Sequence, residues 1–185
     1  YTALLYPLFV VRCQRLFRRV AWGYFWVATV SLVIWALFPV AATTLRPDVT
    51  DLDVSVFHLW GLRVNYALDP PLNLFPSLHV AIATLATLCA YKARPLYGVF
   101  GAVGALLITL STVFVKQHFL VDAVGGILLA GIVYWFTVAD YDPGEEAGSD
   151  DVAFSWRGPL GYVVFHLSLV GGFGLLYLLD WRPFE

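Results

Sequence analysis

The stretch that decides the fold is STVFVKQHFLVDAVGGILLAG, residues 111–131. Most of it has the apolar composition of a membrane-spanning helix. Four strongly polar residues interrupt the apolar run near its start: Lys116, Gln117, His118 and Asp122. An ionisable group at membrane depth costs about 2.5–3.5 kcal/mol or more, so such groups are rare in spans and usually functional. The stretch therefore predicts a junction between membrane helices that carries chemically active side chains.

The whole chain has the composition of a polytopic helical membrane protein. Of its 185 residues, 60% are hydrophobic and 13% are charged, whereas about a quarter of the residues in a soluble domain are charged. The net charge of −2 gives no indication of nucleic-acid binding. The sequence contains no methionine, even at position 1, so we expect Tyr1 to lie inside a longer natural chain.

Apolar runs of roughly 20 residues predict membrane-spanning helices. The four clear candidates cover about 20–41, 77–92, 97–116 and 118–138, and a fifth is expected near 158–180. Residues 1–11 have the pattern of the end of a further helix. Lipid offers no hydrogen-bond partner to the backbone, so each span must be helical. We therefore expect an all-α transmembrane bundle of about six helices. It forms a single integral membrane domain over residues 1–185, with the site in about 20–138.

Basic residues predict the orientation of the chain in the membrane. They cluster before the first long helix and between two later ones: Arg12, Arg15, Arg18 and Arg19, then Lys92 and Arg94. The positive-inside rule assigns both clusters to the cytoplasm. The loop 42–76 and the junction 116–118 then lie on the extracytoplasmic side, and the acidic linker 139–157 lies inside. We therefore expect His79 and His118 at the same depth, on the same side of the membrane.

Each of these histidines stands at the expected start of a helix. Pro76 and Ser77 precede His79; proline suits the first helical turn, and the free N–H groups and positive dipole of a helix start attract anions. His118 and Asp122 are four residues apart, so they share one helix face. The carboxylate can fix the imidazole tautomer and leave the other nitrogen free as a nucleophile or base. The pattern predicts nucleophilic catalysis on an anionic lipid headgroup.

Other interpretations of these residues remain open. The pair formed by His118 and Asp122 can be purely structural. Two histidines at one depth can also ligate a haem, although the carboxylate and the neighbouring lysine would then have no role. Gln117 either donates a hydrogen bond or faces water. Cys13 and Cys89 have no partner at metal-ligand spacing, so we expect small buried apolar residues there and no metal site.

Two motifs resemble those of the type 2 phosphatidic acid phosphatase superfamily. PSLH, residues 76–79, is similar to the family's PSGH-like segment. STVFVKQHFLVD, residues 111–122, has its serine, histidine and aspartate in register with the family's second motif. The resemblance implies catalysis without a metal or other cofactor. It implies four roles: His118 as the nucleophile that forms a phosphohistidine, Asp122 as its orienting carboxylate, His79 as the general acid, and Ser77 as a phosphate ligand.

The chain departs from the family pattern at positively charged positions. Thr112 replaces the usual arginine and Pro39 replaces a common lysine, whereas the Arg-Pro pair that begins at Arg46 is present. Lys116 and Arg46 are therefore the expected cationic partners of the phosphate, with Gln117 as a further hydrogen-bond donor. An ammonium group balances a phosphate charge but lacks the bidentate fork of arginine.

The combination of FPSLH with ST is similar to the inositol phosphorylceramide synthase branch of the superfamily. That branch implies transfer of a phosphoryl or phospho-headgroup between a lipid and an alcohol such as inositol. The alternatives are a lipid-phosphate phosphatase, in which water attacks instead, and a non-catalytic lipid-binding scaffold that keeps the fold. The expected partners are a phosphate-containing lipid, the bilayer and an inositol-like acceptor, with no nucleic acid. The site is expected to open on the extracytoplasmic side.

Overall fold

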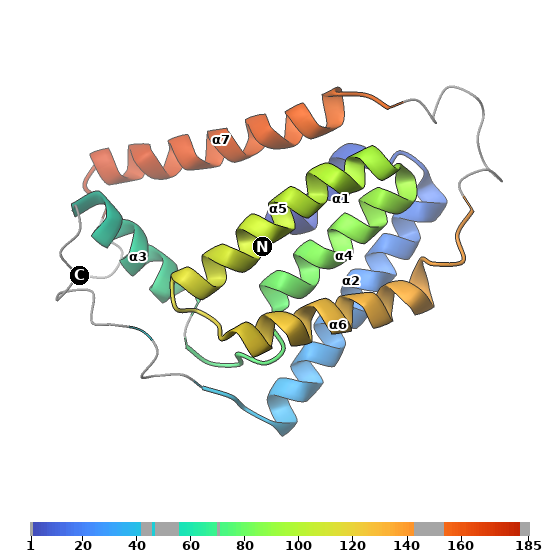
Figure 1. Ribbon diagram of the computed structural model, residues 1–185. Helices are drawn as coiled ribbons and strands as arrows, with labels where there is room; N and C mark the ends of the chain where they lie inside the picture. Colours follow the sequence, from blue (N-terminus) through green and yellow to red (C-terminus); the bar gives the residue numbers. More distant parts are fainter. Residues whose placement is uncertain (1, 42–45, 47–55, 70, 143–153, 182–185) are drawn as a thin grey trace.

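The computed structural model describes residues 2–41, 46, 56–69, 71–142 and 154–181, and its regular elements are all helical (Figure 1). A short 3-10 helix, Thr2–Leu5, leads into the short helix α1, Tyr6–Val10. The remaining helices are α2 (Gln14–Leu37), α3 (Val56–Leu68), α4 (Leu78–Ala93), α5 (Pro95–Phe114), α6 (Leu120–Thr137) and α7 (Arg157–Leu178). The predicted all-α fold is confirmed.

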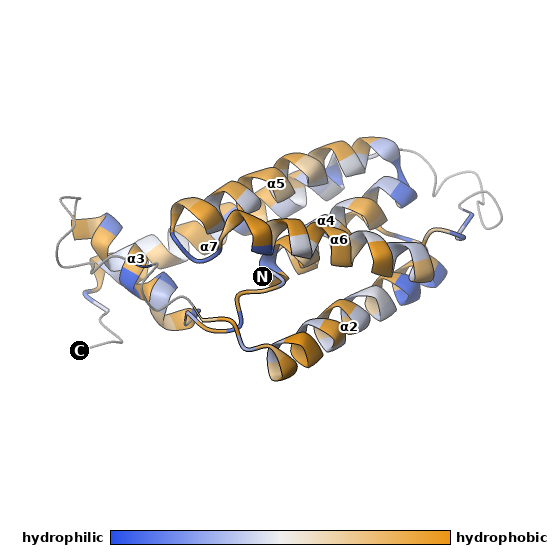
Figure 2. Ribbon diagram, turned by 60° about the horizontal axis from the view of Figure 1, so that its bottom comes forward, coloured by the Kyte–Doolittle hydropathy of each residue, from blue (hydrophilic) through white to orange (hydrophobic). Residues whose placement is uncertain are grey.

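Four of the described helices are long and apolar enough to cross a membrane: α2, α5, α6 and α7. Figure 2 shows apolar residues along their length and polar residues gathered near helix ends and in the connecting segments. Helix α4 is also apolar, but its 16 residues are fewer than the roughly 20 that a perpendicular span requires. The chain is an integral membrane protein, as its composition predicts.

Helix α4 is the centre of the bundle, with α2, α5 and α6 packed around it (Figure 1). Five of its residues are fully buried: Val80, Ala81, Leu85, Cys89 and Ala90. A helix that is apolar on every face is buried rather than amphipathic, and small side chains let neighbouring helices approach closely. Cys89 is thus a small buried residue of the core, as expected.

Arg19 and Lys92, one from each predicted basic cluster, lie at the opposite end of the bundle from the two histidines. Arg19, early in α2, donates to the Thr137 carbonyl at 3.2 Å and forms an ion pair with Asp140, just beyond α6. Lys92, late in α4, donates to the Ala139 carbonyl at 2.8 Å. His79 and His118 stand at the starts of α4 and α6, and both helices run from there in the same direction. The starts of these helices therefore form the end of the bundle opposite to Arg19 and Lys92.

The structure corrects several predicted boundaries. Residues 42–76 were expected to form a loop, but 56–68 form helix α3. The helix expected over 118–138 begins at Leu120, so His118 precedes it instead of lying on it. The first span begins earlier than predicted, at Gln14, because its basic first turns are helical as well. In place of the helix end expected over 1–11, residues 2–10 form two short helical segments.

Helix α3 escaped prediction because its packing partner is distant in sequence. Trp60 lies edge-on to the rings of Phe173 and Tyr177 on α7. Its indole N–H donates to the Trp181 carbonyl at 3.0 Å. These contacts give the short helix an apolar surface to pack on. Most of the predicted acidic linker, residues 143–153, lies outside the described residues.

The close approach of α4 and α6 depends on Gly126. A Cβ atom at this position would lie 2.5 Å from the Ser77 carbonyl oxygen and 3.1 Å from the Ala81 nitrogen. Both are backbone atoms, so neither can rotate away as the end of a side chain would. The two helices can keep this separation only while residue 126 has no side chain.

Gly126→Ala is therefore expected to destabilise the bundle by about 1–3 kcal/mol, the usual range for an overpacked core. Gly131→Ala on the same helix is the matched control, because a Cβ atom there meets nothing within 4 Å. Thermal unfolding of both variants in detergent measures the difference. Equal melting temperatures would show that the two helices do not approach as closely as described.

Candidate active site

The structure brings His79 and His118 together at the end of the bundle where α4 and α6 begin. Their ring centroids are 5.8 Å apart and the ring planes are inclined by 68°. Both side chains line a cavity of about 250 Å³, which Gln117, Asp69 and Asn73 also line. Pockets that enclose a whole drug-sized ligand measure about 300–1,000 Å³, so this cavity suits a polar headgroup rather than an entire lipid.

Hydrogen bonds around Ser77 fix the depth of His79. Ser77 is the N-cap of α4, and its hydroxyl accepts from the Val80 N–H at 3.5 Å. Its own N–H donates to the Asp122 carbonyl at 3.0 Å. This second bond joins the residue before α4 to the first turn of α6. The segments that carry His79 and His118 are therefore held side by side.

A tight turn between α5 and α6 presents His118 to the cavity. Lys116 has a positive φ of 59°, an uncommon conformation for a residue with a side chain. The backbone N–H groups of Gln117 and His118 both donate to the Thr112 carbonyl, at 3.0 and 3.1 Å. The Gln117 amide donates to the Asn65 side chain of α3 at 2.8 Å. Helix α3 thus supports the turn from outside the bundle.

Asp122 caps α6 and faces His118. Its Oδ2 atom accepts from the Phe119 N–H at 2.8 Å and lies 3.6 Å from Nδ1 of His118. The 3.6 Å separation exceeds a hydrogen bond, although catalytic hydrogen bonds are often long before substrate binds. The side chains that the sequence pairs are therefore neighbours, with the carboxylate reaching back from the helix to the residue that precedes it.

Burial influences the protonation of groups that line the cavity, among them His118 and Asp69. Burial lowers the pKa of His118, and the carboxylates of Asp122 and Asp69 oppose this effect only in part. The neutral imidazole, which a nucleophile requires, is favoured as a result. Burial raises the pKa of Asp69, whereas His118 in its protonated form and the positive charge of Arg46 act to lower it.

Three predicted phosphate ligands are absent from the described lining of the cavity. Ser77 is fully buried and serves as a helix cap. Arg46 donates to the Tyr66 carbonyl at 3.3 Å and places its guanidinium 4.5 Å from the centre of the Tyr66 ring. Lys116 is exposed on the turn. Gln117 does line the cavity, as do both histidines, and Asp122 supports His118 from behind.

The cavity also contains an acid that the sequence analysis did not single out. One oxygen of Asp69 and one ring nitrogen each of His79 and His118 lie within 4.8 Å of one another. Two histidines and a carboxylate are a ligand set that transition metals accept, and the same groups serve as acids and bases in metal-free reactions. The one available signal was its place in LDPPLN, just before FPSLH, which keeps Asp69 close to the start of α4.

The fold and the site define a class: helical integral membrane proteins with a histidine pair over a polar cavity at one end of the bundle. The sequence matches the PAP2 superfamily over residues 1–136, and the chain belongs to that superfamily. The expected superfamily is thus confirmed.

The chain is similar to a PA-phosphatase related-family protein of Dictyostelium discoideum. It is 28% identical over 102 residues, which cover 54% of this chain. The chain spans 18% of that relative's length. No solved structure matches the chain.

Two substitutions separate the structural role of Asp122 from its electrostatic role. Asp122→Ala removes the acceptor of the Phe119 N–H and is expected to cost about 0.5–2 kcal/mol of stability, as the loss of a helix cap does. Asp122→Asn keeps an acceptor and is expected to retain most of that stability. Both variants lower the pKa of His118 further, because the carboxylate no longer favours the imidazolium. Thermal unfolding and NMR titration of labelled histidines measure the two effects. An unchanged His118 pKa in the asparagine variant would contradict this pairing.

Proposed function

We propose that the protein is a metal-independent membrane phosphotransferase or phosphatase that acts on a phosphate-containing lipid through a phosphohistidine on His118. One observation carries the proposal: the rings of His79 and His118 lie 5.8 Å apart over one cavity, with the Asp122 carboxylate 3.6 Å behind His118. A nucleophile, a base or acid beside it and an orienting carboxylate are the parts that covalent phosphoryl transfer requires.

In the proposed first step, His118 attacks the phosphorus atom of the lipid. Its Nδ1 atom faces Asp122, so the other ring nitrogen is the attacking atom. The bond from phosphorus to the lipid oxygen breaks, and His79 donates a proton to that leaving oxygen. In the second step, an alcohol or water attacks the phosphohistidine, His79 takes its proton, and His118 is released.

The phosphate charge requires partners beyond the two imidazoles. In this proposal, free N–H groups at the start of α4, which Ser77 caps, contribute to binding of the anionic phosphate. The Gln117 amide adds a donor at the edge of the cavity. Lys116 and Arg46 supply positive charge in the proposed substrate complex, for which their side chains must turn toward the cavity.

Asp69 offers an attacking alcohol a hydrogen-bond acceptor in the cavity. A carboxylate repels a phosphate but accepts a hydrogen bond from a hydroxyl group, so its presence in a phosphate-binding cavity calls for a second ligand. We assign Asp69 to the hydroxyl group of an inositol-like acceptor, in line with the resemblance to the inositol phosphorylceramide synthase branch. The site faces the extracytoplasmic side in this proposal, because Arg19 and Lys92 mark the opposite end as cytoplasmic.

Hydrolysis to free phosphate is the alternative within the same mechanism, since it differs only in the attacking group. A non-catalytic lipid-binding scaffold is the alternative from another class. The absence of arginine and lysine from the described lining of the cavity is the observation that favours it. Measured turnover by the purified protein separates this scaffold from both enzymes.

Substitutions of the two histidines test the proposed division of roles. His118→Ala is expected to lose at least about a thousandfold in turnover of every substrate, because no phosphoenzyme can form. His79→Gln is expected to lose about a hundredfold or more on hexadecyl phosphate, whose leaving alkoxide needs a proton. With p-nitrophenyl phosphate, whose leaving group is stable as an anion, the same variant should keep most of its rate in the first step, measured as the burst of p-nitrophenolate before the phosphohistidine turns over. Radiolabelled, acid-labile phosphohistidine measured after rapid quenching provides a second readout. Full turnover by the His118→Ala protein would remove the mechanism.

Asp69→Asn tests the acceptor assignment by product partition. With hexadecyl phosphate as donor and labelled inositol as acceptor, the ratio of inositol phosphate to free phosphate is expected to fall about tenfold. Asp140→Asn, which changes an acid at the other end of the bundle, is the control and should leave the ratio unchanged. Equal loss of both products would place Asp69 in the first step instead.

Loss of all turnover on adding a chelator would show that a bound metal is required.

A further inference from the structure

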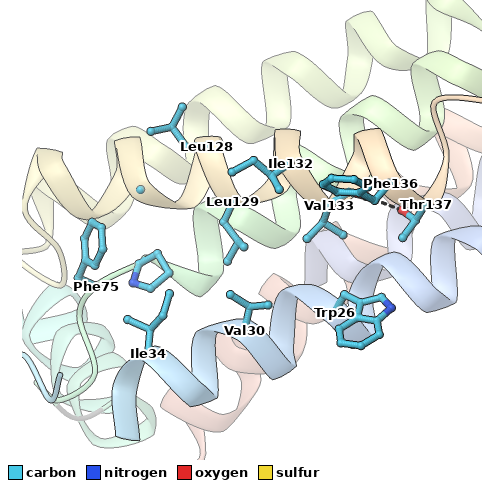
Figure 3. A pocket seen from close by; sticks show the side chains of 12 residues that line it. Trp26, Val30, Ile34, Phe75, Leu128, Leu129, Ile132, Val133, Phe136 and Thr137 are labelled. Carbon is cyan, nitrogen blue, oxygen red and sulfur yellow. Dashed lines mark hydrogen bonds between the residues drawn. The ribbon is translucent and has the colours of Figure 1, made fainter. Parts of the chain in front are cut away.

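A second cavity of the molecule is an apolar groove between α2 and α6. Its volume is about 580 Å³, more than twice that of the polar cavity. Figure 3 shows Val30 and Ile34 of α2 facing Leu129 and Ile132 of α6, with Phe75 at one end and Phe136 at the other. Thr137 at the far end keeps its hydroxyl engaged with the Val133 carbonyl, at 2.7 Å. The groove therefore presents hydrocarbon to whatever occupies it.

The groove and the polar cavity are lined by neighbouring residues at two places in the chain. On α2, Ile34 lines the groove and the next residue, Trp35, lines the polar cavity. On the segment that leads into α4, Pro76 lines the groove and Leu78 lines the polar cavity. Two independent stretches of chain thus pass from one compartment to the other. This adjacency would let one ligand place a polar head in the cavity and an apolar tail in the groove.

The length of the groove fits a hydrocarbon chain. Its lining on α6 extends from Gly125 to Thr137, which corresponds to about 18 Å at 1.5 Å per residue. That distance slightly exceeds half of the roughly 30 Å hydrocarbon core of a bilayer. Ile132 on its wall is 57% exposed, so the groove opens sideways, toward the bilayer. At the far end, Arg19 donates to the Thr137 carbonyl and marks the polar limit of the groove.

We infer that this groove holds the hydrocarbon tail of the lipid whose phosphate binds at His79 and His118. The inference rests on the proposed function and names the part of the substrate that the polar cavity cannot contain. Bilayer lipid is as apolar as the groove, so transfer of the tail from the bilayer brings little hydrophobic gain. The groove acts by orientation: a tail along α6 fixes the phosphate next to the two imidazoles.

One substitution on the groove wall tests this inference against a matched control. Ile132→Trp fills the groove, whereas Ile127→Trp adds the same bulk to α6 at a residue that does not line it. The two isoleucines are similarly exposed, 57% and 46%, so both tryptophans are compatible with folding. The assay compares kcat/KM for hexadecyl phosphate with kcat/KM for butyl phosphate in phosphatidylcholine nanodiscs. Ile34→Trp fills the groove from the opposite wall and guards against an effect peculiar to α6.

The expected result is a loss of about tenfold in the ratio of the two kcat/KM values for both groove variants, with the Ile127→Trp ratio within about twofold of the original protein. An unchanged ratio in the groove variants, or an equal loss in all three, would overturn the inference. The latter outcome would mean that added bulk anywhere on the membrane-facing surface disturbs the enzyme.

Photolabelling gives a readout that does not depend on turnover. Hexadecyl phosphate with a diazirine at mid-chain is expected to label peptides around Val30 and Ile132, and excess unlabelled hexadecyl phosphate should abolish the label. Labelling that persists in that excess, or that concentrates around Ile127, would show that only bulk lipid contacts the groove and would overturn the inference. If His118→Ala kept full turnover while labelling remained specific, the proposed mechanism would fail and the tail site would stand.

Discussion

The separation between the backbones of α4 and α6 is the constraint on which the site depends. At Gly126 the two helices are so close that a methyl group would meet the Ser77 carbonyl at 2.5 Å. At the same place the Ser77 N–H reaches the Asp122 carbonyl. One such hydrogen bond contributes only about 0.5–1.5 kcal/mol, so its importance lies in the alignment it fixes. The cap of α4 is thereby joined to the first turn of α6. His79, next to the cap, and His118, just before α6, are therefore held at the same level.

Helix α2, which also packs on α4, separates the polar cavity from the apolar groove. Neighbouring residues on a helix point about 100° apart, because each turn contains 3.6 residues. Ile34 and Trp35 can therefore line two different compartments from adjacent positions. The proposed substrate has the same division, with a charged phosphate and an apolar chain joined at one atom. A lipid can meet both compartments only where they adjoin, and on the proposed mechanism this is where the reaction takes place.

The sequence predicted the parts of the site that involve nearby residues or the ends of spans. His118 and Asp122 are close in sequence, so their contact follows from local geometry, and membrane topology alone brings His79 to the same end. The acid Asp69 was missed because its approach to the histidines depends on how the segment before α4 folds back. Helix α3 was missed for a similar reason, since Trp60 packs on residues of α7 that are distant in the chain. The start of α6 was misplaced by two residues because its cap is unusual: Phe119 has no capping oxygen, and Asp122 provides one from within the helix.

The small volume of the polar cavity bears on the choice between transfer and hydrolysis. A cavity of about 250 Å³ has room for on the order of eight water molecules at about 30 Å³ each. A polyol that enters after the lipid alcohol has left displaces most of them. The concentration of water next to the phosphohistidine then falls while a hydroxyl group is held beside Asp69 and His79. On the proposed mechanism, the outcome of the second step is therefore decided by which molecule fills the cavity, since either attacking group uses the same imidazoles.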